Sequence, residues 1–215
     1  MKKTPISLTA AQLRVLALTL MFVDHVGRTM FPEQTWMVCL GRLAFPIFAF
    51  QTATGYIHTR DFRGYCRRLL IFGLVSEIPF NLMVTGSFFY PGHQNVMFTL
   101  LLGLLACRAW DTRRWWLLAL ALLGAMFGQT DYGALGAATV LMFHVFRQER
   151  PVLALLLFLL NCFGYGAPSI QSFAVLAMVP IHLYRGEKGR GGKWLQYGSY
   201  LFYPAHMLIL GLLQR

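Results

Sequence analysis

Charged residues are scarce in this chain, and acidic residues are scarcer than basic ones. Of 215 residues, 13% are charged and only 8 are Asp or Glu, whereas 57% are hydrophobic. A soluble domain of this size cannot hide so much apolar surface, and the mean hydropathy of +0.54 points the same way. The composition therefore excludes an ordinary soluble protein and predicts an all-α, polytopic helical membrane protein.

Cysteine is also rare. The four cysteines lie in or beside apolar segments, and their spacing matches neither a metal-ligand motif nor a disulfide framework. We interpret them as small buried hydrophobic residues and expect no metal site. No linker, repeat or low-complexity tract divides the chain, so residues 1–215 are expected to form a single domain.

Apolar stretches recur along the whole chain, and about nine of them are expected to be membrane-spanning helices. Several are shorter than the ~20 residues that a straight helix needs to cross the hydrocarbon core, which predicts thin or re-entrant helices among them. The stretches are residues 13–31, 36–57, 67–84, 95–108, 114–128, 132–147, 151–165, 169–184 and 194–213.

Basic residues fall in alternate gaps between these stretches. The loops around 32–35, 85–94, 129–131 and 166–168 contain no Lys or Arg. The N-terminal segment, the other gaps and the ends of the stretches beside them contain all the basic residues except Arg14, Arg28, Arg42 and Arg215. The positive-inside rule then predicts a cytoplasmic N-terminus. It also explains the net charge of +11, so we expect membrane lipid and no nucleic acid as a partner.

The first stretch contains ionisable residues, which are costly in hydrocarbon unless they are paired or face a wet cavity. Positions 14, 18, 21, 25 and 28 lie on one helical face, so Arg14, His25 and Arg28 are expected to share it. At 1.5 Å per residue, Arg14 and His25 are about 16 Å apart along the axis. Arg14 is therefore expected near the cytoplasmic surface and His25 in the outer half. Asp24 is expected to pair with Arg28 at i+4.

Further ionisable residues lie in later stretches. Arg42 precedes Pro46, which frees a backbone carbonyl near position 42, and a kink there is expected to open a local cavity. Glu77 is expected to pair with an arginine such as Arg42, and His206 lies at similar depth in the last stretch. The outer residues suit acid–base chemistry, whereas the inner basic residues suit a polyanion such as a nucleotide. A membrane histidine is equally well explained as an interhelical hydrogen-bond partner.

Six motifs then carry a resemblance to a known family. They occur in order between residues 14 and 210, and together they resemble the TraX family: FVDHVG, GRLAFPIFAF, LLIFGLVSEIPFNL, QNVMFTLLLGL, DYGALG and LFYPAHMLIL. TraX of conjugative plasmids is an inner-membrane protein that acetylates the N-terminal residue of F-type pilin. The resemblance implies a bacterial inner-membrane acetyltransferase that uses acetyl-CoA, with pilin or another surface molecule as acceptor.

The resemblance also implies roles for individual residues. An arginine followed after ten residues by a histidine, here Arg14 and His25, is similar to a wider class of membrane acyltransferases that use cytoplasmic acyl-CoA. His25 would act as general base or carry the acetyl group, with His206 as a second catalytic candidate. The remaining expected residues are Asp24 or Glu77 to orient an imidazole, Arg42 to stabilise an oxyanion, and Arg14, Arg67, Arg68 and His182 to bind the cofactor.

Two other functions remain open from the sequence. Buried Arg, Glu and His also serve proton-coupled transporters, although the chain shows no inverted repeat. A non-enzymatic assembly factor of a conjugation system is the second alternative, and it would tolerate substitution of the buried histidines.

Overall fold

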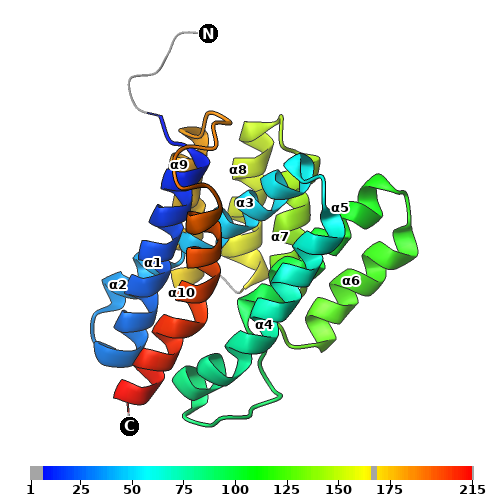
Figure 1. The fold of residues 1–215 in the computed structure, drawn as a ribbon. Coiled ribbons are helices and arrows are strands. Elements are labelled where there is room, and N and C mark those ends of the chain that lie inside the picture. The colour runs from blue at the N-terminus through cyan, green and yellow to red at the C-terminus, as the bar shows by residue number, and fades with distance from the viewer. Residues whose placement is uncertain (1–6, 166–168, 215) are drawn as a thin grey trace.

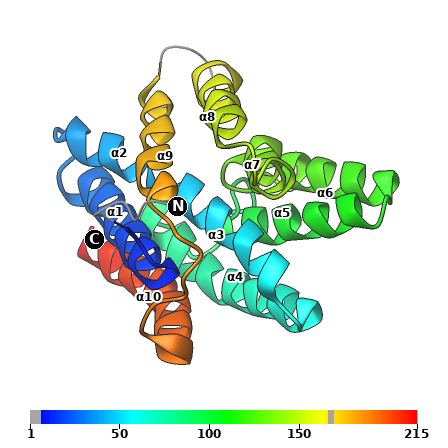
Figure 2. The same ribbon diagram turned by 90° about the horizontal axis from the view of Figure 1, so that it is seen from above.

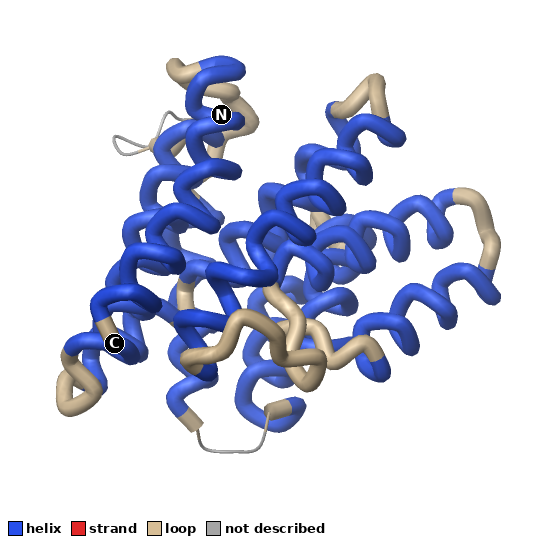
Figure 3. The backbone as a smooth tube through the Cα atoms, turned by 60° about the horizontal axis from the view of Figure 1, so that its bottom comes forward, coloured by secondary structure: helices blue, strands red, loops and turns tan. Residues whose placement is uncertain are grey.

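The structure is a computed structural model that describes residues 7–165 and 169–214. Within these residues every regular element is helical and no strand occurs (Figure 3), which confirms the all-helical class. Three segments are long and apolar enough to cross a membrane: Ala10–Met30, Thr35–His58 and Phe62–Thr85. Lys2, Lys3 and the loop 166–168, which the sequence places on opposite sides of the membrane, lie outside the described residues.

Each predicted apolar stretch corresponds to one helix or to two consecutive helical segments. The elements in order are α1 (Ala10–Met30), α2 (Thr35–Gly41), α3 (Ala44–His58), α4 (Phe62–Thr85), α5 (Val96–Asp111), α6 (Trp115–Phe127), α7 (Gly133–Val145), α8 (Arg150–Leu159), the π-helical η1 (Leu160–Gly164), the 3₁₀-helical η2 (Ile170–Ala177), α9 (Met178–His182) and α10 (Gly192–Leu213).

The second predicted stretch is interrupted where the sequence indicated. Pro46 has no amide hydrogen to donate to the carbonyl of Arg42, and the helix is interrupted at residues 42–43, between α2 and α3. The seventh and eighth stretches depart from a regular α-helix in another way, because they contain the π-helical η1 and the 3₁₀-helical η2. Irregular helical segments of this kind often mark functional sites.

The helices alternate in direction, so their connections gather at two ends of the molecule (Figure 1). We call one the basic end; it comprises the connections 59–61, 112–114, 146–149 and 183–191. There Leu8 and Ala10 donate backbone hydrogen bonds to Leu183 and Glu187. We call the other the opposite end; it comprises the connections 31–34, 86–95 and 128–132, and is joined by backbone hydrogen bonds of Gln94 with Gln129 and Asp131.

The first and last helices run side by side in the same direction. α10 packs against both α1 and α4, so the end of the chain closes back onto its beginning (Figures 1 and 2). α5 packs against α4 and α7, whereas α6 lies at the edge of the bundle against α5 and α7. Residues that are far apart in sequence, on α1 and α10, are therefore brought to the same depth.

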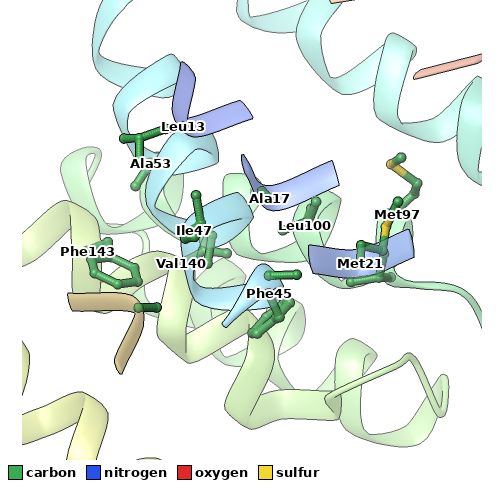
Figure 4. Packing of buried hydrophobic residues seen from close by; sticks show 14 of the residues in the cluster. Leu13, Ala17, Met21, Phe45, Ile47, Ala53, Met97, Leu100, Val140 and Phe143 are labelled. Atoms are coloured by element: carbon green, nitrogen blue, oxygen red, sulfur yellow. The ribbon is translucent and has the colours of Figure 1, made fainter. Parts of the chain in front are cut away.

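The packed core follows one stripe of α1. Leu13, Ala17 and Met21 are spaced by one helical turn and pack towards α3 and α5, and α3 separates them from α7 (Figure 4). The same buried stripe continues to Asp24 and Gly27. The fold therefore places a carboxylate in a position where the preceding turns place apolar side chains.

Leu104 and Leu105 test this packing as a matched pair. Leu104 of α5 is fully buried, whereas the neighbouring Leu105 is 37% exposed on the surface of the helix. Leu104→Ala should lower the free energy of unfolding by about 2–5 kcal/mol, because it removes buried contacts and leaves a cavity. Leu105→Ala should cost much less. Thermal unfolding of both variants in the same detergent measures the difference, and equal losses would contradict the arrangement of α5.

Candidate functional site

Two histidines from opposite ends of the sequence meet inside the bundle. Nδ1 of His25 on α1 lies 2.7 Å from Nε2 of His206 on α10. The ring planes are nearly parallel, at 8°, and the ring centroids are 5.0 Å apart. Because the two nitrogens are only 2.7 Å apart, the rings meet edge to edge and do not stack face to face. His206 is buried and His25 is half-buried. The sequence placed both at similar depth but did not predict that they touch.

A backbone carbonyl fixes the direction of this hydrogen bond. Nδ1 of His206 lies 2.7 Å from the carbonyl oxygen of Phe202, and a carbonyl only accepts, so this nitrogen carries a hydrogen. In a neutral His206, Nε2 is then an acceptor, and Nδ1 of His25 must donate to it. A neutral His25 consequently has its lone pair on Nε2. This nitrogen has no hydrogen-bond partner among the described residues.

Next to this pair, one carboxylate binds two arginines. Asp24 is 5% exposed, and its Oδ2 accepts from Nε of Arg28 at 2.9 Å, which is the expected i, i+4 pair. Its Oδ1 accepts from Nη2 of Arg42 at 2.5 Å. Both carboxylate oxygens are therefore occupied. Asp24 neutralises a buried cation between α1 and α2, and neither oxygen is paired with an imidazole.

Close approach of α1 and α2 depends on Gly41. A Cβ added at this position would collide with Cβ of Asp24. Any larger residue would displace the carboxylate, so glycine is required for the contact between Asp24 and the neighbouring Arg42.

Arg42 is held by further partners on other elements. Its Nη1 donates to the hydroxyl of Tyr132 at 3.4 Å and to Oε1 of Gln171 at 3.3 Å. Gln171 in turn donates to Oδ1 of the buried Asn161, within the π-helical η1, at 3.0 Å. This network joins α2, α7, η1 and η2 around one guanidinium, which fixes its position beside His25.

Tyr132 occupies an uncommon backbone conformation. Its φ of +65° is rare for a residue with a side chain, and its ring stacks on Phe45 with centroids 3.9 Å apart. Its hydroxyl accepts from Arg42, and its own hydrogen has no acceptor among the described residues. Strain of this kind persists where the surroundings hold it and is common at functional sites. Tyr132 therefore offers a hydrogen-bond donor next to His25.

At the opposite end of the molecule, close to the site, a histidine and a carboxylate form a pair. Nε2 of His93 lies 3.5 Å from Oδ1 of Asp131, and both side chains are partly exposed. The hydrogen bond to Asp131 raises the pKa of His93, although partial burial acts in the opposite direction. The pair lies at the mouth of the site and can exchange with solvent.

A series of cavities that share lining residues extends from each end of the molecule to His25. At the basic end a cavity of about 450 Å³ shares Arg14, Gln51 and Gln196 with a smaller cavity of about 80 Å³. The smaller cavity shares Met21 and Tyr203 with one of about 40 Å³ that reaches His25. From there a cavity of about 340 Å³ continues to the opposite end.

The polar face predicted on α1 lines this succession of cavities. In order from the basic end, the lining residues are Arg14, Leu18, Met21, His25 and Arg28. Helical spacing alone therefore predicted which face of α1 lines the cavities.

Glu77 is not part of this site. Its Oε1 accepts hydrogen bonds from the backbone amide and the side-chain amide of Asn95, at the start of α5. The expected Glu77–Arg42 pair does not form, because Arg42 is already bound to Asp24. Glu77 instead caps the connection between α4 and α5.

The four residues expected to bind a cofactor are also separated. Arg14 lines two cavities, and Arg68 lies over the ring of Tyr65, which lines one of them. Arg67 points about 100° away from the neighbouring Arg68, because consecutive helical residues differ by this angle, and it lies on the exposed side of α4. His182 binds the carbonyl of Met178 within its own helix. Arg67 and His182 are therefore not brought to the cavity.

Sequence reasoning missed Tyr132, Gln171 and Asn161 as members of the site. The DYGALG motif contains Tyr132, and a tyrosine before a glycine at a helix start was the available signal. Gln171 and Asn161 gave no signal, because single amides in apolar stretches are common. They join the site only through the packing of η1 and η2 near Arg42, which a sequence pattern does not specify.

These features define a helical membrane protein with a polar site in its interior and cavities leading to it from two ends. The family model described as TraX protein matches residues 9–214, and the chain belongs to the TraX family. No solved structure gives a significant match to the chain.

Curated relatives are similar over almost the whole chain. A protein of Dichelobacter nodosus named "Probable fimbrial assembly protein FimC, serogroup H1" is 29% identical, and the match covers 95% of each chain. A protein of Escherichia coli (strain K12) named "Protein TraX" is also 29% identical, over 94% of this chain and 85% of its own length. A second Escherichia coli "Protein TraX" is 30% identical over the same shares.

The two arginines on Asp24 should differ in their effect on stability. The side chain of Arg42 is 12% exposed and that of Arg28 is 50% exposed. Arg42→Gln should lower the free energy of unfolding by about 3–5 kcal/mol, because breaking a buried pair leaves a charge without its partner. Arg28→Gln should cost about 1 kcal/mol or less. Thermal melts of the two variants give the comparison; a more damaging Arg28→Gln would show that the buried pair is assigned to the wrong arginine.

Proposed function

We propose that this protein is a membrane-embedded acetyltransferase. It takes an acetyl group from acetyl-CoA at the basic end and passes it to an acceptor that enters from the opposite end. The observation that carries this proposal is the contact between His25 and His206, which leaves the lone pair of a neutral His25 on Nε2, in a residue that lines both the innermost cavity and the cavity of the opposite end.

The donor supplies a thioester, whose carbonyl carbon is activated for attack by an amine or a hydroxyl. Nε2 of His25 accepts the proton of the attacking group as the new bond to the acetyl carbon forms. The hydrogen on Nδ1 of His25 is already directed at His206, so the positive charge can be shared along the pair to the Phe202 carbonyl. His25 then returns the proton to the departing thiolate, which balances the reaction. An acetyl group carried transiently by His25 would use the same lone pair.

Negative charge develops on the carbonyl oxygen during attack. Arg42 and Tyr132 line the same cavity as His25, and the Tyr132 hydroxyl still has a hydrogen to donate. The guanidinium polarises this hydroxyl and contributes its own charge. Both groups are fixed in advance by their neighbours, which is what stabilisation of an oxyanion requires. Asp24 acts through Arg42 and is a positioning residue.

Orientation follows from the charges at the two ends. The basic end would face the cytoplasm, with a cytoplasmic N-terminus and about nine passes through the inner membrane of a bacterium. This arrangement gives acetyl-CoA access to Arg14 and leaves the opposite end for an acceptor outside. The relative named for fimbrial assembly supports a role with a surface fibre, so a pilin subunit is the acceptor class we propose.

The catalytic role of His25 can be separated from a structural role by conservative substitution. His25→Gln should reduce acetyl-CoA turnover by at least about a hundredfold, because an amide cannot take up a proton at neutral pH. His206→Gln should retain more activity, since the glutamine oxygen can still accept from Nδ1 of His25. His182→Gln, on the exposed surface, is the matched control.

Turnover and thermal unfolding of the purified variants should be measured together. Asp24→Asn should lose stability first and keep residual turnover, because its part is to hold Arg42. If His25→Gln turns over near the wild-type rate, His25 is a packing residue. A non-enzymatic assembly role would then be favoured.

The orientation is tested by cysteine labelling of intact cells. Phe89 lies in the 86–95 connection and is 79% exposed, and Glu187 lies in an exposed part of the 183–191 connection. A membrane-impermeant maleimide should label Phe89→Cys and not Glu187→Cys, and both should react after permeabilisation. External labelling of Glu187→Cys would reverse the proposed orientation.

A further inference from the structure

The cavity at the basic end has an unbalanced positive charge. Its volume is about 450 Å³, and its lining includes four basic side chains and no carboxylate among the described residues. The four are Arg14, Lys188, Arg190 and Lys193. Within the described part of the chain, none of these four side chains forms an ion pair. A cavity of this size and charge is suited to an anionic ligand as large as a nucleotide.

The segment 186–193, which we call the glycine-rich loop, forms one wall of the cavity. Gly186, Gly189, Gly191 and Gly192 all have positive φ, between +47° and +122°. The sequence GEKGRGGK therefore follows a path that other residues rarely adopt, and it carries its basic side chains on a backbone without bulk. The backbone itself can approach a ligand in the cavity.

Hydrogen bonding distinguishes the two helix starts beside this loop. At α1, the amides of Ala10 and Ala11 donate to the carbonyls of Glu187 and Lys188, and Thr9 forms a capping box with Gln12. At α10, a helix of 22 residues, the N-cap Gly191 provides no side chain. The first amides of α10, at 192–194, have no acceptor among the described residues. These donors add to the basic side chains on the cavity wall.

We propose that the glycine-rich loop and Arg14 bind the phosphate groups of the donor nucleotide. This rests on the proposed function, because it assigns the phosphate-binding part of the same donor site. Arg14, Gln51 and Gln196 are shared with the narrower cavity that continues towards His25. The wide, basic part thus receives the nucleotide, and the narrow, mostly apolar part receives the acyl-bearing arm.

The test compares a donor that has phosphates with one that has none. Lys188→Gln combined with Arg190→Gln should raise KM for acetyl-CoA by about a hundredfold, because each hydrogen bond from a charged side chain to a phosphate contributes roughly tenfold in affinity. kcat should stay unchanged, because neither residue approaches His25. KM for S-acetylpantetheine, which lacks the nucleotide, should not move. Both side chains are exposed, so the variant should fold, and its melt should match the wild type.

Arg63→Gln is the control, because Arg63 is an exposed arginine at the same end that does not line the cavity. It should leave KM for acetyl-CoA unchanged. Equal KM values for acetyl-CoA in the double variant and the wild type would overturn the phosphate site while leaving acetyl transfer intact. An equal rise in the double variant and in Arg63→Gln would also overturn it, because the effect would be general surface charge. Wild-type protein that neither binds CoA nor turns over acetyl-CoA would instead refute the proposed function itself.

Discussion

The carbonyl oxygen of Phe202 determines the state of the whole site. It accepts a hydrogen bond from Nδ1 of His206, so Nε2 of a neutral His206 is an acceptor for Nδ1 of His25. The lone pair of His25 is consequently on its Nε2. One backbone group on α10 thus determines which nitrogen of a side chain on α1 carries the hydrogen, and this requires α1 and α10 to pack together with the two histidines at the same depth. The packing of the last helix against the first is therefore a condition for the proposed chemistry as well as for the stability of the bundle.

Asp24 provides the second constraint, because it occupies the buried stripe of α1 where an apolar residue would otherwise pack. Isolated, this carboxylate would be costly in a membrane interior. Paired with Arg42 it becomes a fixed junction, and Gly41 leaves the room for it. Arg42 in turn holds Tyr132 and Gln171, so the amides and the strained tyrosine depend on the same ion pair. The ion pair offsets the free-energy cost of burying the Asp24 carboxylate, and it also holds a rigid set of polar side chains beside His25.

Much of this arrangement was accessible from the sequence, and the remainder has a physical reason for being hidden. Helical spacing identified the face of Arg14, His25 and Arg28, and Pro46 identified the break beside Arg42, because both are local consequences of backbone geometry. The partner of Glu77 and the positions of Arg67 and His182 depend on how helices rotate against one another, which spacing within one helix does not determine. Asn161 and Gln171 were hidden for the same reason.

The proton positions on the two histidines test the central claim most directly. Nitrogen-15 NMR of the purified protein, labelled at the histidine rings and assigned by comparison with His25→Gln and His206→Gln, reports which ring nitrogen carries the hydrogen. In the neutral state both His25 and His206 should be protonated at Nδ1, with a bare Nε2 on His25. A hydrogen on Nε2 of His25, with its Nδ1 bare, would contradict the proposed mechanism, because no base would then face the cavity.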